Sequence, residues 1–424
     1  MEFFGLLIFL FLVYIRPQDF VPGLLGARLV FVAMALTIFY WIMTEVQRRT
    51  TKLFNLTQDF WLFGLAVAVL ISTFKINWLS YTLNTLVEMS KLLAFYFMVS
   101  FIIDSEKRLE VFVKFLVFFM MAVCFVAALQ PFGIDIFKVG MSEDRIQGVG
   151  IFQNPNYLAY SAIFALPFAY NLLVRSQGFA NRMLGFSALS VLVWAIFLTK
   201  SRGGFICFVL TMLFTIGQTR GRVFRLLVNL FSVLIILLAV TNGFGRMGTL
   251  LNMQQDSAIM DRVEAWYVAI QLFKESPLTG IGYGRFEEYS RKAAHSSFVQ
   301  IGVENGVIGL FLWVGFLYFL LKRTKWLVSH SSLSKTYFLS LEGTLFAYLV
   351  TSFLATMGLR ITLFIIGGLV AAAERMELKK ENLKREEKMV LTSSGFFQPR
   401  EIRNILAATV GVVYLWHLLI KAIG

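Results

Sequence analysis

The chain has 424 residues, of which 58% are hydrophobic and 15% charged, and its mean hydropathy is +0.72. This composition excludes a soluble domain, because apolar runs long enough to cross a hydrocarbon core of ~30 Å recur along almost the whole length. The net charge of +14 does not indicate a nucleic-acid partner, because the basic residues form short clusters between apolar runs, without a basic stripe of interleaved aromatic residues.

The apolar runs predict an all-α polytopic membrane protein, because a segment in lipid satisfies its own backbone hydrogen bonds as a helix. The first run, Phe3–Tyr14, lacks a basic leader and a small-residue cleavage site, so we expect a retained helix and not a signal peptide. A last run at 403–420 could be a thirteenth span or a helix in the membrane interface. The twelve expected transmembrane helices are 3–15, 27–43, 60–74, 84–103, 111–129, 156–174, 183–199, 203–217, 224–241, 303–321, 336–356 and 359–373.

The distribution of lysine and arginine predicts the orientation. With a cytoplasmic N-terminus, the inner segments hold 21 of these residues in 82 positions and the outer segments hold 13 in 114. This asymmetry is the one that cytoplasmic loops of membrane proteins show. We therefore expect one membrane domain over 1–424, a large outer loop at 242–302, and a cytoplasmic charged tail at 374–402 that forms a solvated helix.

The outer loop 242–302 carries an unusual number of ionisable side chains. Asp256–Ser276 within it is predicted to be an amphipathic helix, because apolar residues recur there at three- and four-residue spacing. Further arginines fall in other segments expected on the same side. The candidate site residues of the outer side are Arg145, Arg202, Arg262, Arg285, Arg291, His295 and Arg360.

Each of the three main candidates also has a purely structural interpretation. Arg202 precedes two glycines that allow a tight turn, but an arginine at a helix end can also extend towards the lipid headgroups. Arg262 could stack on Trp266 or pair with a neighbouring carboxylate, Asp261 or Glu264. A lone histidine such as His295 at a helix entrance is usually a cap or a surface residue.

The loop 130–155 contains a helix-start signal and a further arginine, and several common catalytic and cofactor-binding motifs are missing from the sequence. Asn154 followed by Pro155 is a suitable N-cap and first-turn pair for the next helix, and Arg145 in this loop could reach a polar ligand. The sequence contains no phosphate-binding loop, no zinc-binding histidine pattern and no nucleophilic serine elbow. We therefore expect no cofactor and no metal site.

An ordered set of short motifs resembles the O-antigen ligase and polymerase superfamily of bacterial envelope glycan enzymes. One departure is Ser296, where the family more often has asparagine after the histidine. The match in order and spacing covers about residues 145–320, and the remainder matches in hydropathy alone. The stretches are Gly150–Asn156, Ser201–Gly203, Asp261–Trp266, Pro277–Gly282, His295–Phe298 and Glu304–Gly309.

The resemblance implies transfer of a glycan from a polyprenyl (undecaprenyl) diphosphate carrier to an acceptor, on the periplasmic face of the bacterial inner membrane. The family's two functional arginines fall on Arg202 and Arg262, and its functional histidine falls on His295. Arginine suits diphosphate because its charge is permanent and its donors are forked. A neutral histidine could accept the proton of the acceptor hydroxyl, so we expect direct displacement with inversion. The rival assignment makes His295 another phosphate ligand.

Several alternatives stay open at the level of sequence. The expected acceptor is lipid A-core, as in an O-antigen ligase, but a second lipid-linked repeat unit (a polymerase) or a protein hydroxyl is compatible with the same motifs. A transporter or flippase of lipid-linked sugars is the alternative from another class. It predicts charged residues in the middle of spans, whereas Glu88, Lys91 and Lys114 lie near span ends by the boundaries above. The sugar and the oligomeric state are not specified.

Overall fold

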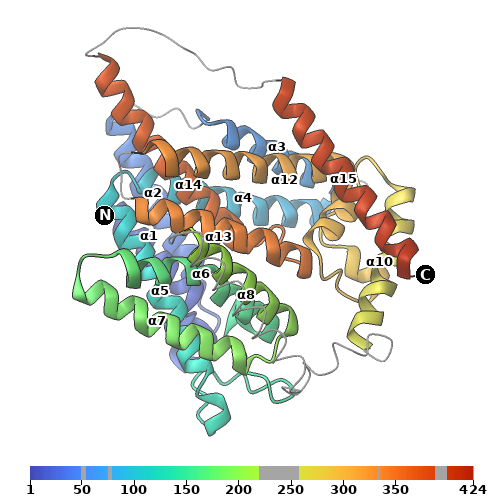
Figure 1. The fold of residues 1–424 in the computed structure, drawn as a ribbon, viewed down its shortest axis with the longest axis horizontal. Helices are drawn as coiled ribbons and strands as arrows, with labels where there is room; N and C mark the ends of the chain where they lie inside the picture. Colours follow the sequence, from blue (N-terminus) through green and yellow to red (C-terminus); the bar gives the residue numbers. More distant parts are fainter. Residues whose placement is uncertain (49–53, 75–78, 219–256, 332–334, 387–398, 424) are drawn as a thin grey trace.

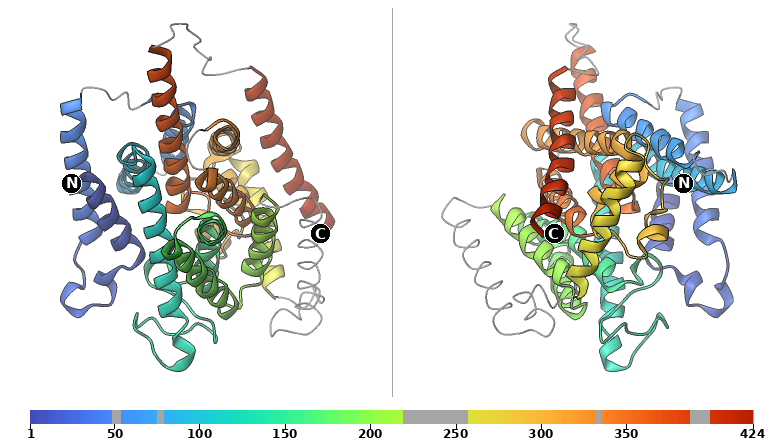
Figure 2. Two further views of the ribbon diagram at one scale, coloured as in Figure 1. Left: turned by 60° about the vertical axis from the view of Figure 1, so that its left-hand side comes forward. Right: turned by 90° about the vertical axis from the view of Figure 1, so that its right-hand side faces the viewer.

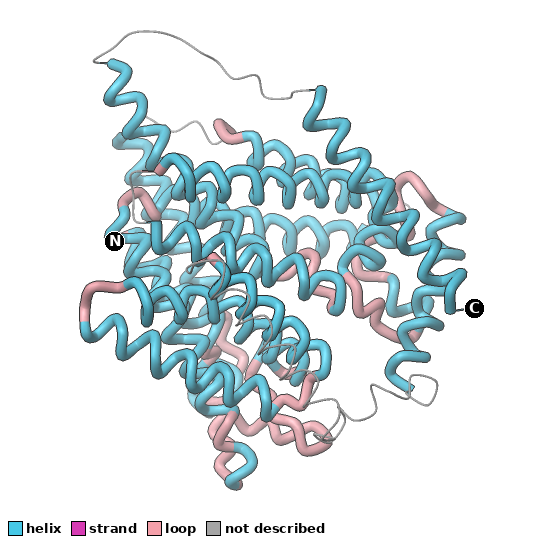
Figure 3. Tube along the Cα trace, viewed as in Figure 1, coloured by secondary structure: helices cyan, strands magenta, loops and turns pink. Residues whose placement is uncertain are grey.

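The computed structural model describes residues 1–48, 54–74, 79–218, 257–331, 335–386 and 399–423. Over these ranges the chain forms helices joined by turns and loops, with one isolated β-bridge and no strand (Figures 1 and 3), which confirms the all-α prediction. The α-helices are α1 (Glu2–Tyr14), α2 (Leu29–Arg48), α3 (Thr57–Thr73), α4 (Leu79–Ile102), α5 (Glu106–Ala127), α6 (Pro155–Arg175), α7 (Phe179–Leu198), α8 (Arg202–Gly217), α10 (Ser257–Glu275), α11 (Phe286–Ser290), α12 (Ser297–His330), α13 (Lys335–Leu354), α14 (Ile361–Glu386) and α15 (Pro399–Ile423).

Seven of the described helices are long and apolar enough to cross a membrane, by length and composition. Two shorter apolar helices, α3 and α8, accompany them. Large apolar side chains on the outer faces of the bundle are exposed, as expected of helices that contact lipid. The polytopic membrane fold is thus confirmed, whereas the count of twelve spans stays a prediction. The expected span 224–241 lies outside the described residues. The seven candidates are Leu29–Val46, Leu79–Ile102, Glu106–Phe132, Pro155–Arg175, Phe179–Leu198, Ser297–His330 and Lys335–Leu354.

The segments that the charge pattern assigns to the outer side gather at one end of the helix bundle, here called the loop end. Arg145 Nε donates to the carbonyl of Thr199 at 2.8 Å, which ties the loop before α6 to the turn between α7 and α8. Ser297 Oγ donates to the carbonyl of Ala355 at 2.8 Å, which ties the start of α12 to the loop after α13. In the right view of Figure 2, which faces the right-hand side of Figure 1, α10 of this end lies at the front in yellow. That it faces outward is a prediction from the charge pattern.

The opposite end of the bundle, here called the tail end, contains a buried network of charges. Glu374 of α14 is 2% exposed and pairs with Arg323 Nε of α12 at 3.1 Å. Arg375 Nη2 pairs with the buried Asp59 of α3 at 2.7 Å. The expectation that the segment from 374 onward is a solvated helix is therefore wrong for its first turn, because these charges are removed from water and paired within the protein.

The C-terminal helix α15 runs beside α12. Near its start Glu401 forms an ion pair with Lys322 of α12. Further along, Trp416 packs against Phe273 of α10, with ring centroids 5.8 Å apart. Figure 1 shows α15 crossing from the tail end towards α10. It thus runs between the two ends of the bundle, although by length and composition it is not among the seven candidate spans.

Candidate functional site

The amphipathic helix predicted at Asp256–Ser276 is confirmed as α10, and it anchors the segment before α12. Its buried face includes Ala265 and Ala269, both 0% exposed, and Trp266 lies beside this face. The indole Nε1 of Trp266 donates to the carbonyl of Ala294 at 2.7 Å. The residue that follows Ala294 is His295, so this hydrogen bond fixes the main chain next to the histidine.

Charged residues of α10 make a second anchor for the same segment. Lys292 Nζ pairs with Asp261 at 2.8 Å and also with Glu264. These two carboxylates are the ones that the sequence offered as partners of Arg262, and the structure pairs them with Lys292 instead. Arg262 itself forms no ion pair and stacks on no aromatic ring among the residues that the structure describes. Its positive charge acts on Tyr160 and His295 nearby.

His295 lies beside Arg262. Its side chain is half-buried, and its main chain is left-handed, with a φ of 47°, a conformation that costs free energy in a residue with a side chain and often marks functional sites. Burial lowers the pKa of His295 below its ordinary value, and the positive charge of Arg262 lowers it further, whereas Asp261 opposes the shift. The imidazole is therefore predominantly neutral at pH 7, with a lone pair that can accept a proton.

Tyr160 of α6 links Arg262 to the start of α8. The charge of Arg262 acts on the Tyr160 hydroxyl, which also hydrogen-bonds with Ser201. A Cβ at Gly203 would lie 2.6 Å from that hydroxyl, so the glycine permits this close approach. Ser201 is the N-cap of α8 and Arg202 its first residue. Arg262 and the start of α8, whose first residue is Arg202, thus both lie close to Tyr160, and the α8 dipole adds positive charge there.

The loop after α13 is held tightly against the residues that follow His295. Ser297 Oγ donates to Ala355 and accepts a hydrogen bond of 2.8 Å from the Met357 amide. The carbonyl of Gly358 accepts hydrogen bonds from Tyr348 at 2.7 Å and from Trp313 at 3.2 Å. This loop is therefore a rigid support for Arg360, which follows it directly.

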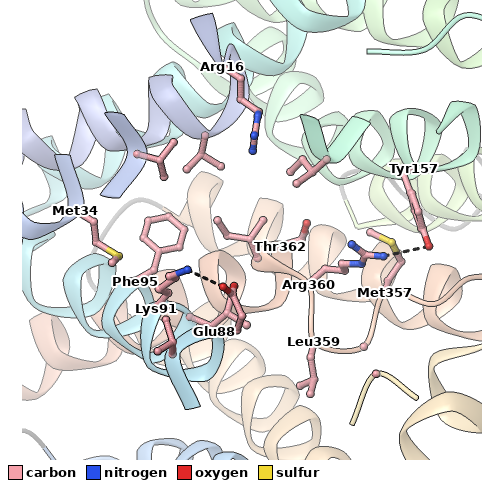
Figure 4. Close-up of a pocket in the computed structure, with 18 of the residues that line it drawn as sticks. Arg16, Met34, Glu88, Lys91, Phe95, Tyr157, Met357, Leu359, Arg360 and Thr362 are labelled. Carbon is pink, nitrogen blue, oxygen red and sulfur yellow. Dashed lines mark hydrogen bonds and ion pairs between the residues drawn. The ribbon is translucent and has the colours of Figure 1, made fainter. Parts of the chain in front are cut away.

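A cavity of about 1010 Å³ lies on the other side of this loop and is lined by residues of several helices (Figure 4). Arg360 lines it, donating to the Tyr157 hydroxyl at 3.2 Å and stacking over the Tyr157 ring at 4.8 Å. Much of the apolar part of the wall comes from α1, α2 and α4. Arg202, Arg262 and His295 do not line it. The cavity and the Arg262–His295 pair are thus separate features at the loop end.

The positions of Glu88 and Lys91 differ from the expected ones. The predicted span began at 84, which put both residues near its end, whereas α4 already begins at Leu79 and places them near its middle. They pair with each other at 2.6 Å, and both line the cavity. A pair at i and i+3 satisfies its own charges, which allows a helix to continue where hydropathy falls. Lys114 similarly pairs with Glu110, at 2.5 Å.

The glycine-rich stretch Pro277–Gly282 packs against a break in α12. This helix begins at Ser297, earlier than the expected Val303, and is interrupted at Gly306, where φ is 66°. An interruption frees backbone groups that need other partners, and the stretch supplies them. The hydrogen bonds run from Val307 N to Pro277 O (2.8 Å), from Ile308 N to Leu278 O (3.3 Å), from Ile281 N to Val303 O (3.0 Å) and from Gly282 N to Glu304 O (3.0 Å).

Sequence reasoning did not assign a role to Glu304, which lies two residues before this break. Its side chain is 2% exposed, lines the cavity and accepts hydrogen bonds from Phe286 N at 3.3 Å and Gln300 Nε2 at 3.2 Å. Tyr157, Tyr160 and Ser297 were also missed. Glu304 and Ser297 lie within the family motifs and Tyr157 directly follows one of them, and that proximity was the available signal; Tyr160 lies outside them.

Of the remaining candidate arginines, Arg145 and Arg285 have partners within the protein and Arg291 is exposed. Arg145 also donates through Nη2 to Asn156 at 2.6 Å and so holds the loop against α6 and α7. The adjacent Asn154 accepts a hydrogen bond from the Asn156 amide at 2.8 Å, which confirms the predicted N-cap. Arg285 pairs with Glu288 at 2.9 Å, and Arg291 is exposed at the end of α11. Neither Arg285 nor Arg291 lines the cavity.

Fold and site together define a polytopic helical membrane protein with arginines, a histidine and a large cavity gathered at one end. A family model described as O-antigen ligase matches residues 187–314, from α7 into α12. Over this part of the chain, which is less than half of its length, the sequence is similar to the O-antigen ligase family, as the ordered motifs predicted. No curated protein matches the chain.

Proposed function

We propose that the protein transfers a glycan from a polyprenyl diphosphate carrier to an acceptor hydroxyl, as an O-antigen ligase does. The observation that carries the proposal is that Tyr160 lies close both to Arg262, whose charge also acts on His295, and to the start of α8, where Arg202 is the first residue. Two fixed positive charges beside a neutral imidazole suit a reaction in which one substrate carries a diphosphate and the other must lose a proton.

The proposed step is a direct displacement. The acceptor oxygen attacks the anomeric carbon of the sugar, while the bond between that carbon and the phosphate oxygen breaks. Arg202 and Arg262 stabilise the negative charge that develops on the departing diphosphate. His295 accepts the proton of the acceptor hydroxyl and becomes an imidazolium ion, which later loses that proton to water. Because the nucleophile attacks opposite to the leaving group, the anomeric configuration inverts.

The proposed reaction does not require a metal ion. Diphosphate is already a good leaving group and needs charge stabilisation more than a proton, which permanent guanidinium charges provide. We therefore propose a metal-independent enzyme. Of the described residues, no group of three or more His, Cys, Asp or Glu is positioned to hold a metal ion.

We place the reaction on the periplasmic face of the bacterial inner membrane, with the loop end outward. The support is the excess of lysine and arginine in the segments that lead to the tail end. The preferred acceptor is lipid A-core. A polymerase that extends a lipid-linked repeat unit and a protein O-oligosaccharyltransferase use the same donor and remain the alternatives within this class.

One observation favours a different class, a transporter or flippase of lipid-linked sugars. Glu88 and Lys91 form an ion pair near the middle of α4 and line the cavity, where a translocation path would require charges. A transporter binds its substrate without needing a base. His295→Ala therefore separates the two classes, because it would leave transport intact and abolish transfer.

The test of the proposed function is deletion of the gene, followed by comparison of the surface glycan with the lipid-linked pool. A ligase predicts long polymer that stays on its carrier and moves to the surface again when the wild-type gene is restored. Single repeat units in place of long chains would indicate a polymerase. A glycan profile that deletion leaves unchanged would contradict the proposal. The anomeric configuration of the product tests inversion, and a retained configuration would require a covalent intermediate.

A further inference from the structure

Arg262 and His295 lie beside a small cluster of buried side chains that is separate from the main core of the bundle. Ala265 of α10 follows Arg262 by three residues, and Ala294 directly precedes His295, and both belong to this cluster, here called the loop-end core. The packing of this core therefore determines where α10 stands relative to the segment that carries the histidine. The buried members of the loop-end core are Ala265, Ala269, Leu272, Phe286, Ala294, Val299, Val303 and Trp416.

One member of the loop-end core comes from the C-terminal helix. All the others lie within 265–303, whereas Trp416 belongs to α15, and its side chain is 5% exposed. Its ring packs against Phe273 of α10, with ring centroids 5.8 Å apart and an angle of 61° between the ring planes. A Cβ at Gly302 of α12 would lie 3.7 Å from Cζ3 of Trp416. Trp416 thus contacts both α10 and α12.

Trp416 is the largest side chain of the loop-end core. Three of the other buried members are alanines and two are valines, which fill little volume. A buried tryptophan contributes far more contact area than any of these residues. Loss of the indole would leave a cavity between α10 and α12, and surrounding elements relax into such a cavity only in part. The position of α10 therefore depends on Trp416.

The helix that carries Trp416 is itself held against α12. Glu401, Ile405 and Thr409 follow one another at four-residue spacing and are 7%, 0% and 1% exposed. Trp416 follows about two helical turns later on the same face. Glu401 also forms an ion pair with Lys322 of α12. These contacts fix α15 along its length, so the indole has a defined position from which it supports α10 (Figure 1).

The pKa of His295 depends on where α10 lies. Burial lowers this pKa, Arg262 lowers it further, and Asp261 of the same helix opposes the shift. Lys292, on the segment before α12, is paired with Asp261 and Glu264. If α10 moved away from this segment, both lowering effects would weaken. The pKa of His295 would then rise towards 6.5, its ordinary value.

We propose that Trp416 is a positioning residue of the transfer reaction: it fills the space between α10 and α12 and so holds Arg262 beside His295. This inference rests on the proposed function, because the two positioned residues are those of the proposed reaction. It assigns a role to α15, which lies outside the residues that the family model matches. The C-terminal helix is thus part of the transferase and not merely a further membrane-associated helix.

The first measurement is glycan transfer by the purified full-length protein in phosphatidylcholine nanodiscs, with undecaprenyl-diphosphate-linked glycan as the donor. We expect Trp416→Ala to lower kcat about tenfold or more, because small displacements of a positioned group have effects of this size. The acid limb of kcat/KM should move to higher pH. Trp416→Phe, which keeps a ring against Phe273, should restore most of the activity and the wild-type limb.

The matched control is Tyr414→Ala. Tyr414 is also aromatic and lies two residues before Trp416 on the same helix, but its side chain is 61% exposed. This variant should transfer glycan as the wild type does, with the same acid limb. Effects in Tyr414→Ala as large as those in Trp416→Ala would overturn the inference, because they would not depend on the loop-end core.

The second measurement needs no transfer. The chain has three histidines, so ¹⁵N-histidine labelling gives few NMR signals, and His295→Gln identifies the signal of His295. In Trp416→Ala we expect the pKa of His295 to rise by about half a pH unit or more. Trp416→Leu keeps the core apolar and should show a smaller rise, and it provides the test if the alanine variant does not fold.

The two measurements separate this inference from the proposed function. An unchanged pKa of His295 and an unchanged acid limb in the folded Trp416 variants would overturn the inference and leave the proposed function standing. Lower activity with an unmoved acid limb would also overturn it, because Trp416 would then contribute to stability alone. A raised pKa of His295 in Trp416→Ala, in a protein that transfers no glycan, would contradict the proposed function and support Trp416 as the residue that positions α10.

Discussion

The indole nitrogen of Trp266 donates a 2.7 Å hydrogen bond to the carbonyl oxygen of Ala294. Trp266 lies one turn after Arg262 on α10, and Ala294 directly precedes His295. The bond thus joins the helix that carries the arginine to the segment that carries the histidine, and Lys292 reinforces it through Asp261 and Glu264. In the proposed reaction, these anchors keep the base and the cation at a fixed separation.

The first prediction concerns this anchor. Trp266→Phe keeps the ring but removes the donor, so the Ala294 carbonyl loses its partner, and we expect kcat to fall about tenfold, in line with the cost of one lost hydrogen bond. Donor binding is expected to change little. Trp194→Phe, at a partly exposed position of α7, is the control and should behave as the wild type. Equal activity in Trp266→Phe and the control would contradict the anchoring role.

The second prediction concerns pH. The pKa of His295 is lowered below its ordinary value by burial and by Arg262, and only the neutral imidazole can act as a base. The imidazole therefore stays neutral, and the enzyme active, to a lower pH than a free histidine would allow. We expect the acid limb of kcat/KM to lie below 6.5, the ordinary pKa of histidine. Arg262→Gln should move the limb of the residual activity upward, whereas Arg262→Lys should not. An acid limb above pH 7 in the wild type would speak against His295 as the base.

The third prediction contrasts two arginines. Arg145 donates hydrogen bonds to Thr199 and Asn156. Because Arg145→Ala removes these charge-assisted hydrogen bonds, we expect the free energy of unfolding to fall by about 2 kcal/mol. The affinity for the donor should stay nearly unchanged. Arg262→Gln should leave thermal stability nearly unchanged and lower the rate of transfer roughly 100-fold. Thermal unfolding and transfer assays on both variants test this. The reverse pattern would mean that the two residues have exchanged roles.

The fourth prediction concerns the break in α12. A Cβ at Gly306 would lie 2.2 Å from the Leu278 carbonyl oxygen, and its φ of 66° is unfavourable for a side chain. We expect Gly306→Ala to destabilise the protein by about 2 kcal/mol or more and to reduce the yield of folded protein. In Gly411→Ala nothing lies within 4 Å of the new Cβ, and alanine favours a helix, so this control should unfold at the wild-type temperature or slightly above it. Equal unfolding temperatures for the two variants would show that the loop does not pack as described.

The local patterns of the sequence predicted the elements that carry the site well. The apolar spacing that predicted α10 and the Asn154 cap of α6 both depend on residues within one or two helical turns, so a local pattern is enough to indicate them. The same holds for most apolar helices. Hydropathy was less reliable where a helix carries its own ion pair, as at Glu88 and Lys91. The two charged residues lower the mean hydropathy of the segment, so the start of α4 was predicted too far along the chain.

Contacts between residues far apart in the sequence could not be predicted from local patterns. The buried Glu374 pairs with Arg323 of another helix, and the pKa of His295 is lowered by its burial and by Arg262 of α10. The resemblance named Arg202, Arg262 and His295, but it contained no information on Tyr160, which joins two of them. The cavity also arises from several helices at once, and no single motif indicates it.

The measurement that tests the central claim most directly is glycan transfer by His295→Ala, compared with its binding of undecaprenyl diphosphate, in the purified full-length protein. The account predicts that transfer falls at least about 100-fold, the contribution of a positioned base, while donor binding stays within a few-fold of the wild type. Full transfer activity in His295→Ala would contradict the proposed base. Loss of donor binding in step with activity would make His295 a phosphate ligand instead.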